Sequence, residues 1–473
     1  MSRRAFVFTL ALLLGFGAAA AAQSPASGRW EGAITIMGQD LGIVVVLTAD
    51  APPKGTIDIP QQGAKDLPLA NVRVEGQKVH FELAAGPGVA VFDGELKGEQ
   101  LSGTFEQAGV KGTFALKKGN APAQEPPPPY KQEEVKLENG GLTLAGTLTV
   151  PPGGGPHPAL ILITGSGAQN RDEDVFGFKV FKLLADHLTR AGFAVLRCDD
   201  RGVGGSTGST MEATTSDFAD DVLAQVKFLK TQPAIDKARI GLLGHSEGAL
   251  VAPMVATRSP EIAFLVLLSG PAVTGEKIML AQADLIGRAE GKTPEQVRAN
   301  AEVQKILFTA ARENKGWDDA LLAVKAATRK AIAALPEEQR NGIPNVDVLV
   351  NRQAESQVAF ARSPWFRFFL DYDPAPPLAR VACPVLAVFG ELDLQVPTQQ
   401  NRSVMEDTVK KGGNRNWTFV VVPKANHLYQ AATTGSATEY PKLKKEFAPG
   451  FLDTITSWLT KVTRPVPPPG AFQ

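Results

Sequence analysis

The chain has 473 residues, of which 44% are hydrophobic and 21% are charged, a balance typical of globular proteins; its length predicts two or three domains. Basic and acidic residues number 49 each, and no long basic run occurs. We therefore expect no nucleic-acid partner.

Residues 1–22 are typical of an export signal. Arg3 and Arg4 precede an apolar run over 5–14, and the alanines at 20–22 offer a small-residue cleavage site. A retained membrane anchor is the less favoured alternative, because this run is shorter than the ~20 residues that a membrane-spanning helix needs. No later segment reaches that length. The sequence predicts a bacterial periplasmic or secreted protein with no stable membrane span after cleavage.

Residues 25–118 form short alternating segments separated by Gly, Asn and Asp, such as 41–48, 72–83 and 89–96. This pattern predicts a small antiparallel all-β sandwich or barrel. The segment contains no obvious set of acid, base and nucleophile. Residues 119–131 follow as a linker, in which four consecutive prolines favour a stiff extended chain.

The pattern changes at residue 132, where a catalytic domain spanning 132–464 is expected. A hairpin is predicted over 134–150, and strands then alternate with helices. The strand segments are almost continuously apolar, which is typical of parallel strands covered on both faces. The fold class is therefore α/β with a mostly parallel sheet. The expected strands are 159–163, 194–197, 240–243, 263–268, 385–389 and 418–422. The Pro-rich residues 465–473 are expected to form a tail.

One interval, 272–380, interrupts this alternation with helical periodicity and few strand signals. A structureless loop of that length would be unusual, so a helical insertion is predicted. Near its end, Trp365, Phe366 and Phe369 are candidates for an acyl pocket, since ligand sites are mostly apolar. The alternative for these aromatic residues is ordinary core packing.

The strongest chemical signal is Gly-His-Ser-Glu-Gly at 244–248, which lies between the apolar strand 240–243 and the helical pattern 249–257. Glycines on both sides of Ser246 allow a tight strand-to-helix turn that exposes the hydroxyl group. Ser246 is therefore the predicted nucleophile.

A serine hydroxyl needs a base and an acid that orients this base. In α/β proteins whose nucleophile lies on such a strand-to-helix turn, the acid comes next along the chain and the histidine last, each on a loop that follows one of the later strands. Asp393 is the favoured acid, with Glu391 as the alternative. His427 is the predicted base, because the other four of the five histidines lie in unsuitable segments or, for His245, directly beside the serine.

The oxyanion of the reaction needs hydrogen-bond donors that are in place beforehand. The backbone N–H of Glu247 is one candidate, and the N–H of Ser166 or of Gly167 is the other. An ordinary tight turn is the alternative for the Gly-Ser-Gly segment at 165–167.

No cofactor or metal is expected. The Gly-rich segment 202–208 lacks the Lys-Ser/Thr of a phosphate loop, and 165–170 lacks the third glycine of a dinucleotide fingerprint. Cys198 and Cys383 are expected at opposite edges of the sheet, too far apart for a disulfide. Ion pairs and turns are expected around 199–201.

The segments ITGSGAQNRDED (163–174), RCDDRGVGGS (197–206), GHSEG, GELDLQVP (390–397) and ANH (425–427) together resemble α/β-hydrolase serine esterases. They are most similar to the bacterial carboxylesterase branch described as acylaminoacyl-peptidase-like. The resemblance spans 132–462, although the first loop begins Thr164-Gly165 where many relatives have His-Gly. It implies carboxylesterase activity on acyl esters, no cofactor, and a lid made by the insertion.

The sequence thus predicts an exported serine hydrolase that cleaves small acyl esters through an acyl-enzyme on Ser246. A peptidase or amidase with the same catalytic residues is one alternative. The other is a glycan- or surface-binding protein with incidental esterase activity. The oligomeric state, acyl-chain length and role of the β domain do not follow from the sequence.

Overall fold

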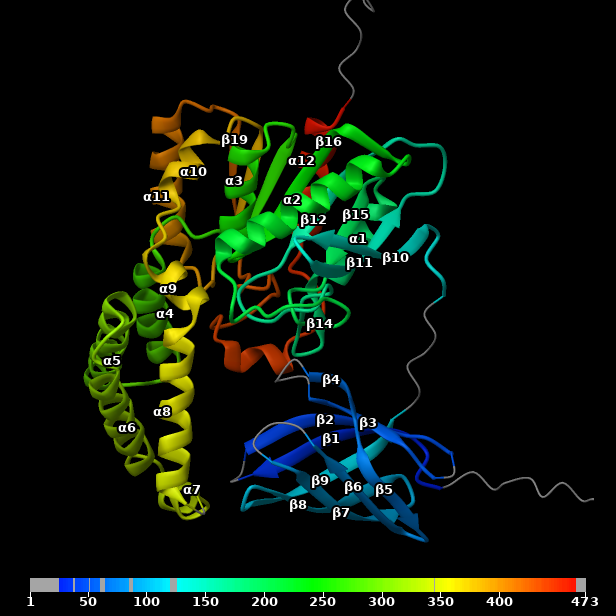
Figure 1. Cartoon of the computed structure of the whole chain (residues 1–473), viewed down its shortest axis with the longest axis vertical. Coiled ribbons are helices and arrows are strands. Elements are labelled where there is room, and N and C mark those ends of the chain that lie inside the picture. The colour runs from blue at the N-terminus through cyan, green and yellow to red at the C-terminus, as the bar shows by residue number, and fades with distance from the viewer. Residues whose placement is uncertain are drawn as a thin grey trace, which may run out of the picture. The chain divides into compact units, whose positions relative to one another are not determined.

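The computed structural model of the protein describes residues 25–464 except 37–38, 51, 60–63, 85–87, 120–125 and 344 (Figure 1). The expected export signal and C-terminal tail lie outside the described residues, as does the 120–125 part of the expected linker. The chain divides into two compact units that separate near Ala123.

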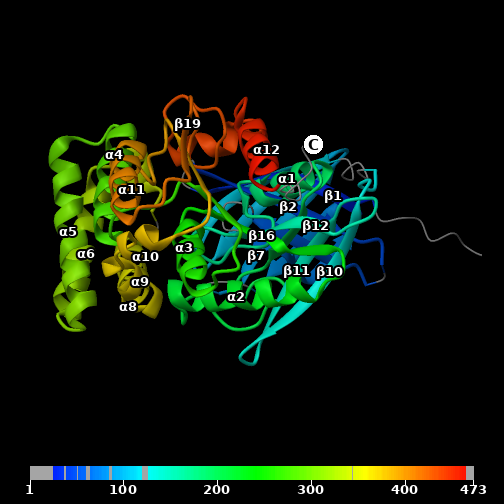
Figure 2. The same cartoon turned by 90° about the horizontal axis from the view of Figure 1, so that it is seen from above.

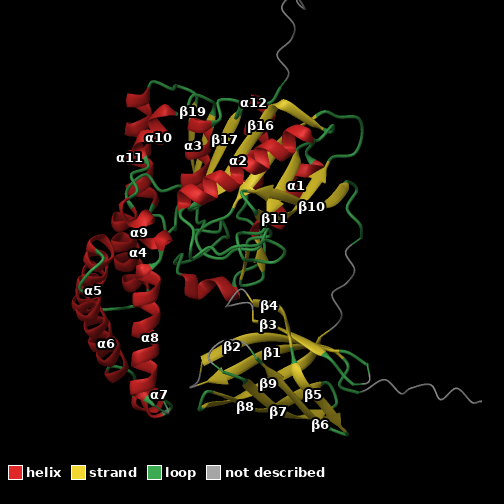
Figure 3. Cartoon of the chain, viewed as in Figure 1, coloured by secondary structure: helices red, strands yellow, loops and turns green. Residues whose placement is uncertain are grey.

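The N-terminal unit is one curved sheet with the strand order β4-β3-β2-β1-β9-β8-β7-β6-β5 (Figure 3). Every pairing from β3 round to β5 is antiparallel, as the alternating pattern predicted. Trp30, Phe81, Phe92 and Phe114 are fully buried in its interior. The strands are β1 Gly28–Ile36, β2 Gln39–Leu47, β3 Gly55–Ile59, β4 Ala64–Pro68, β5 Ala70–Glu75, β6 Lys78–Leu83, β7 Ala90–Lys97, β8 Gln100–Gln107 and β9 Val110–Gly119.

The C-terminal unit is built on an eight-stranded sheet with the order β10-β11-β15-β12-β16-β17-β18-β19. The β10–β11 hairpin is antiparallel and joins β15 antiparallel, whereas all pairings from β15 to β19 are parallel. The predicted fold class is therefore confirmed. The strands are β10 Lys131–Asn139, β11 Leu142–Val150, β12 His157–Ile163, β15 Ala194–Cys198, β16 Ile235–His245, β17 Phe264–Leu268, β18 Val385–Gly390 and β19 Trp417–Val422.

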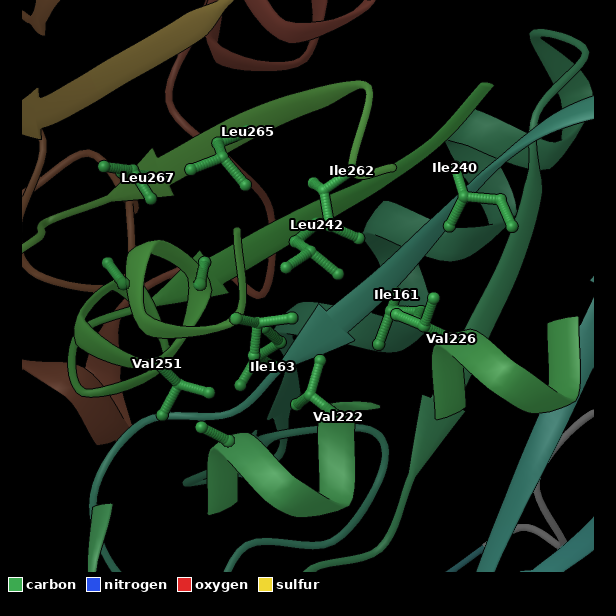
Figure 4. Close-up of a cluster of buried hydrophobic side chains, with 14 of the residues drawn as sticks. Ile161, Ile163, Val222, Val226, Ile240, Leu242, Val251, Ile262, Leu265 and Leu267 are labelled. Carbon is green, nitrogen blue, oxygen red and sulfur yellow. The ribbon is translucent and has the colours of Figure 1, made fainter. Parts of the chain in front are cut away.

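Helices cover both faces of this sheet, because alternate side chains of each buried strand point in opposite directions. One face packs on α2 (Thr215–Thr231), α3 (Gly248–Arg258) and α11 (Thr398–Gly412). Figure 2 shows α2 and α3 from above, and Figure 4 shows part of this core. In that core Ile161, Ile163 and Leu242 of the sheet meet Val222 and Val226 of α2. The other face packs on α1 (Val180–Arg190) and α12 (Phe451–Val462).

In the described part of the interval between β17 and β18 the structure has seven helices. Five of them contribute to a separate hydrophobic cluster, which Leu250 of α3 also joins, whereas Leu378 of the last helix packs in the core of the sheet. Several begin at a residue whose side chain caps the helix, such as Thr293 before α5 and Ser363 before α9. They are α4 Gly275–Ala289, α5 Pro294–Glu313, α6 Trp317–Ala333, α7 Glu337–Asn341, α8 Val346–Arg362, α9 Pro364–Asp371 and α10 Ala375–Arg380.

Two short strands, β13 (Asp174–Val175) and β14 (Phe178–Lys179), and a 3-10 helix, η2 (Ala437–Lys442), complete the secondary structure. Cys198 and Cys383 are both free, as expected from their places at β15 and before β18. In the part of the chain that the structure describes, no helix combines the length and apolar character needed to cross a membrane.

Candidate active site

Ser246 lies in the sharp turn between β16 and α3. Its φ angle is +53°, a left-handed backbone conformation that is rare for a residue with a side chain. Its amide donates to the Leu268 carbonyl at 2.8 Å. A side-chain carbon at Gly248 would lie 2.1 Å from the Ile163 carbonyl oxygen, and one at Gly244 would lie 2.1 Å from the Gly248 oxygen. The close approach of these backbones therefore requires both glycines.

Asp393 and His427 meet on the loops that follow β18 and β19. His427 Nδ1 lies 2.8 Å from Asp393 Oδ2, and both side chains are buried. Asp393 Oδ1 accepts the backbone N–H groups of Gln395 and Val396, each at 2.9 Å. Burial opposes ionisation of Asp393, but the His427 ring and the backbone donor hold its pKa below the usual value.

The structure distinguishes between the two candidate acids. Glu391 is exposed and accepts the backbone N–H of Lys424 at 2.7 Å, so its carboxylate is engaged away from the histidine. Asp393 is the carboxylate that contacts His427.

A cavity of about 1050 Å³, part of it open to solvent, brings the predicted residues together. Ser246, His427, Ser166 and Glu247 all line it, together with Trp365 and Phe369 from α9. Phe366 is not among the lining residues; it packs in the core of the insertion, 5.3 Å from Phe360 and 6.0 Å from Phe308 between ring centres. Its side chain therefore supports α9 instead of forming the cavity wall.

The expected oxyanion donors come from two different segments of the chain. Glu247 immediately precedes α3, so its N–H lies at the positive end of a helix. Ser166 lines the cavity from the loop after β12, whereas Gly167 does not. In the described part of the chain, no backbone oxygen accepts the amide hydrogen of Glu247, Ser166 or Gly167.

The Glu247 side chain makes contacts that the sequence did not reveal. Its Oε1 accepts the Thr215 hydroxyl at 2.6 Å and the Trp365 indole N–H at 2.8 Å. Burial raises the pKa of Glu247 above its usual value, and the nearby side chains of Thr215, Trp365 and Ser166 oppose this effect. Glu247 therefore connects the turn at Ser246 to α2 and to α9.

Ion pairs and hydrogen bonds hold the loop after β12 in place. Some of them involve residues 199–201, where ion pairs were expected. Arg171 Nη2 lies 2.7 Å from Asp199 Oδ2 and its Nη1 lies 2.5 Å from Glu134 Oε2. Asp200 accepts the Thr164 hydroxyl at 2.7 Å and the Gln169 N–H at 2.9 Å. These contacts fix both ends of the loop that carries Ser166.

The sequence also missed a pair formed by Glu173 and His245. Glu173 Oε1 and His245 Nδ1 are 2.8 Å apart, and both side chains are almost fully buried beside the cavity. The two residues are 72 positions apart in the chain. The one local signal is the acidic run that contains Glu173, at 172–174.

The chain is similar in sequence to several known proteins. Residues 178–337, which include Ser246, match the family described as serine aminopeptidase, S33. The esterase EstD of Thermotoga maritima is 25% identical over 363 residues, which cover 76% of this chain and 74% of EstD. The esterase FrsA of Klebsiella pneumoniae is 27% identical over 180 residues, or 38% of this chain and 39% of FrsA.

Among solved structures, an esterase of Pyrococcus furiosus is similar with a TM-score of 0.43 and 18% identity, over 70% of this chain and 91% of that one. A proline iminopeptidase of Mycobacterium smegmatis has a TM-score of 0.42 and 18% identity, over 70% and 98% of the two chains.

The sheet order and the strand-to-helix turn at Ser246 give the chain an α/β-hydrolase fold, and its sequence is similar to that of hydrolases. It aligns over about three quarters of its length with a bacterial esterase, EstD.

Proposed function

We propose that the protein is an exported serine esterase in which Ser246, His427 and Asp393 form the catalytic triad. The main support is one arrangement: Ser246 lies on a strained turn in the cavity that His427 also lines, and Asp393 contacts the far nitrogen of the His427 ring. The alignment with esterases supports the reaction type. The export signal rests on residues 1–22 of the sequence.

The proposed chemistry is acyl transfer through a covalent intermediate. His427 Nε2 removes the proton from the Ser246 hydroxyl, and the oxygen attacks the carbonyl carbon of the ester. The amides of Glu247 and of Ser166 or Gly167 stabilise the negative oxygen of the tetrahedral intermediate. His427 then protonates the leaving alcohol, and water releases the acid from Ser246 by the reverse sequence of proton transfers.

The cavity lining favours a small ester with an apolar acyl group. Trp365 and Phe369 stack with ring centres 5.0 Å apart, and Ile278, Met279 and Leu428 also line the cavity. Polar side chains such as Gln169 and Gln395 line it as well. Apolar walls with few polar groups are typical of small-molecule sites.

A peptidase or amidase is the second candidate. The match of residues 178–337 to the serine aminopeptidase family favours it, and the same catalytic residues serve both reactions. An amide has a poorer leaving group than an ester. The rates at which the protein cleaves ester and amide substrates therefore distinguish an esterase from a peptidase or amidase.

Turnover of p-nitrophenyl acetate, butyrate and octanoate, measured beside amino-acyl p-nitroanilides, tests the proposal. We expect ester turnover in the purified mature protein, and a loss of at least about a thousandfold in kcat for Ser246→Ala. Turnover of the anilides alone would favour the peptidase. Ester turnover that survives in Ser246→Ala would refute the proposed nucleophile.

Export is tested separately by expressing the full chain in a bacterium and fractionating the cells. We expect periplasmic or secreted protein whose N-terminus begins at Gln23. An intact N-terminus on cytoplasmic protein would contradict the export proposal and leave the catalytic proposal unaffected.

A further inference from the structure

His245 occupies an unusual position between two parts of the active site. Its Nδ1 lies 2.8 Å from Glu173 Oε1, and its Nε2 lies 3.0 Å from the backbone oxygen of His427. Its ring centre is 4.7 Å from that of His427. Glu173 Oε1 also accepts the backbone N–H of Gly165 at 2.9 Å. One buried pair thus touches both the loop before Ser166 and the loop that carries the proposed base.

The hydrogen-bond partners limit where the protons on this pair can be. A backbone carbonyl oxygen only accepts, so His245 Nε2 carries a hydrogen. Glu173 Oε1 accepts from Gly165, and as a carboxylate oxygen it needs a hydrogen on His245 Nδ1 as well. With Glu173 ionised, both ring nitrogens of His245 are donors and the ring is positively charged. The charges of the two buried side chains then cancel.

The surroundings support this charge state. The other charged and titratable groups near the ring are His427, Asp393 and Tyr429, and Asp200 lies within the field of Glu173. Burial opposes the positive ring, yet Glu173, the His427 carbonyl and Asp393 together raise the pKa of His245 above its usual value. A buried charge is tolerated in proteins when it is paired and hydrogen-bonded in this way.

Glu173 itself is held in a strained conformation. Its φ angle is +47°, which costs energy for a residue with a side chain, and it is 1% exposed. Its second oxygen, Oε2, has no hydrogen-bond partner among the described residues. Such a side chain is retained at a cost to stability, and strain of this kind is concentrated at functional sites.

We infer that Glu173 and His245 form a buried ion pair that positions the active site, in which the doubly protonated His245 ring holds the His427 loop and the Glu173 carboxylate holds Gly165 before the oxyanion loop. Neither side chain reacts with substrate; they act through the placement of His427 and Ser166. The catalytic part of this inference rests on the proposed function, whereas the charge state of the pair does not.

The charge state is tested by NMR on the full-length mature protein with 15N-labelled histidine rings. We expect His245 to show a hydrogen bonded to each ring nitrogen near neutral pH. Its signals are assigned by replacing each of the other four histidines in turn with glutamine. A His245 ring with a single proton would overturn the ion pair, whatever the activity of the protein.

Kinetics of Glu173→Gln test the positioning role. The introduced amide has the size of the carboxylate, but no single atom of it can both accept from Gly165 and donate to a neutral His245. We expect kcat for p-nitrophenyl butyrate to fall between about tenfold and a hundredfold with little change in KM, since a small misplacement of catalytic groups has this effect. The alkaline limb of the pH profile moves to lower pH, because the ring loses the carboxylate that retains its proton.

The matched control is His187→Gln, which removes a histidine that contacts Thr456 and lines no part of the cavity; we expect it to retain kcat. Unchanged kcat and pH profile in folded Glu173→Gln would overturn the positioning role. The NMR signature of the ion pair in a folded wild-type protein that shows no esterase turnover would refute the proposed function while leaving the ion pair established.

Discussion

Asp393 uses its two carboxylate oxygens for different contacts. Oδ1 accepts two backbone N–H groups from the turn that follows β18, and Oδ2 faces His427 Nδ1. The backbone donors fix the carboxylate so that the second oxygen selects one tautomer of the histidine. In that tautomer Nε2 has a free lone pair that can accept the serine proton.

Asp393→Asn should therefore remove activity without unfolding the chain. Its amide oxygen can still accept the two backbone N–H groups, but its NH2 group then faces His427 Nδ1 and favours the wrong tautomer. We expect kcat for p-nitrophenyl butyrate to fall about ten-thousandfold, as such a change does in serine proteases. Circular dichroism should remain that of the wild type. A loss of less than about tenfold would show that Asp393 is not the orienting acid.

The buried carboxyl group of Glu247 lowers the stability of the folded chain at neutral pH. Burial raises the pKa of its carboxyl group, so the folded chain holds this proton more tightly than the unfolded chain. The ionised side chain therefore destabilises the fold as the pH rises through and above the usual glutamate value of 4.5. Below that value the effect disappears.

Glu247→Gln should for this reason raise the Tm at neutral pH by a few degrees. The amide oxygen can accept from Thr215 and Trp365 as Glu247 Oε1 does, without a buried charge. The difference from wild type should shrink as the pH falls below the usual carboxyl range. Thermal unfolding between acid and neutral pH measures it, and an equal Tm difference at all pH values would contradict the pKa direction.

At the scale of elements, α9 forms one wall of the Ser246 cavity. It begins at the Ser363 cap and presents Trp365 and Phe369 to the cavity, while Phe366 packs among the helices of the insertion. The Trp365 indole N–H donates a hydrogen bond from this wall to Glu247, the residue after Ser246. Alignment of the wall should therefore depend on this donor.

Trp365→Phe retains an aromatic ring but removes the donor, and leaves the Glu247 carboxylate with one fewer hydrogen bond. We expect kcat/KM for p-nitrophenyl octanoate to fall about tenfold, the effect of losing a charge-assisted hydrogen bond. The value for acetate should change less than about twofold if, as proposed, the wall contacts the longer acyl chain.

Phe366→Leu is the matched variant for this test. Its side chain belongs to the core of the insertion, so we expect a lower Tm and an unchanged ratio of acetate to octanoate turnover. If Trp365→Phe also leaves that ratio unchanged, α9 does not select the acyl chain.

At the scale of the whole molecule, the chain consists of two units with separate interiors. The N-terminal sheet buries its own aromatic cluster, and the described residues that line the Ser246 cavity all come from the C-terminal unit. Tyr130, which the sequence assigned to the linker, donates to Asp186 of α1 at 2.8 Å and therefore belongs with the C-terminal unit.

A protein that begins at Pro126 should fold and retain the wild-type kcat on p-nitrophenyl butyrate, because it keeps Tyr130 and the whole cavity. Full activity of this 126–473 protein on small esters, with weaker binding to glycans or cell-surface material, would assign recognition to the β domain. Loss of esterase activity in a folded truncated protein would contradict the independence of the catalytic unit.

Regular elements could be predicted from the sequence because their signals are local. The apolar runs of β12, β16 and β18, the glycines at 244 and 248, and the polar helical repeat of the insertion each depend on neighbouring residues alone. The choice between Asp393 and Glu391 was open, since both follow the same strand. It was decided by which carboxylate reaches His427 across the sheet edge.

By itself, the sequence determined the two-unit organisation, the α/β fold class and the candidate residues Ser246 and His427, since periodicity and turn chemistry are properties of short segments. Only the tertiary structure showed that Glu247 contacts Trp365 and that Glu173 pairs with His245. These partners are separated by 118 and 72 positions in the chain. Hydrogen bonds between such distant positions depend on how the loops at the carboxyl edge of the sheet come together. Local sequence patterns do not predict which of these loops are in contact.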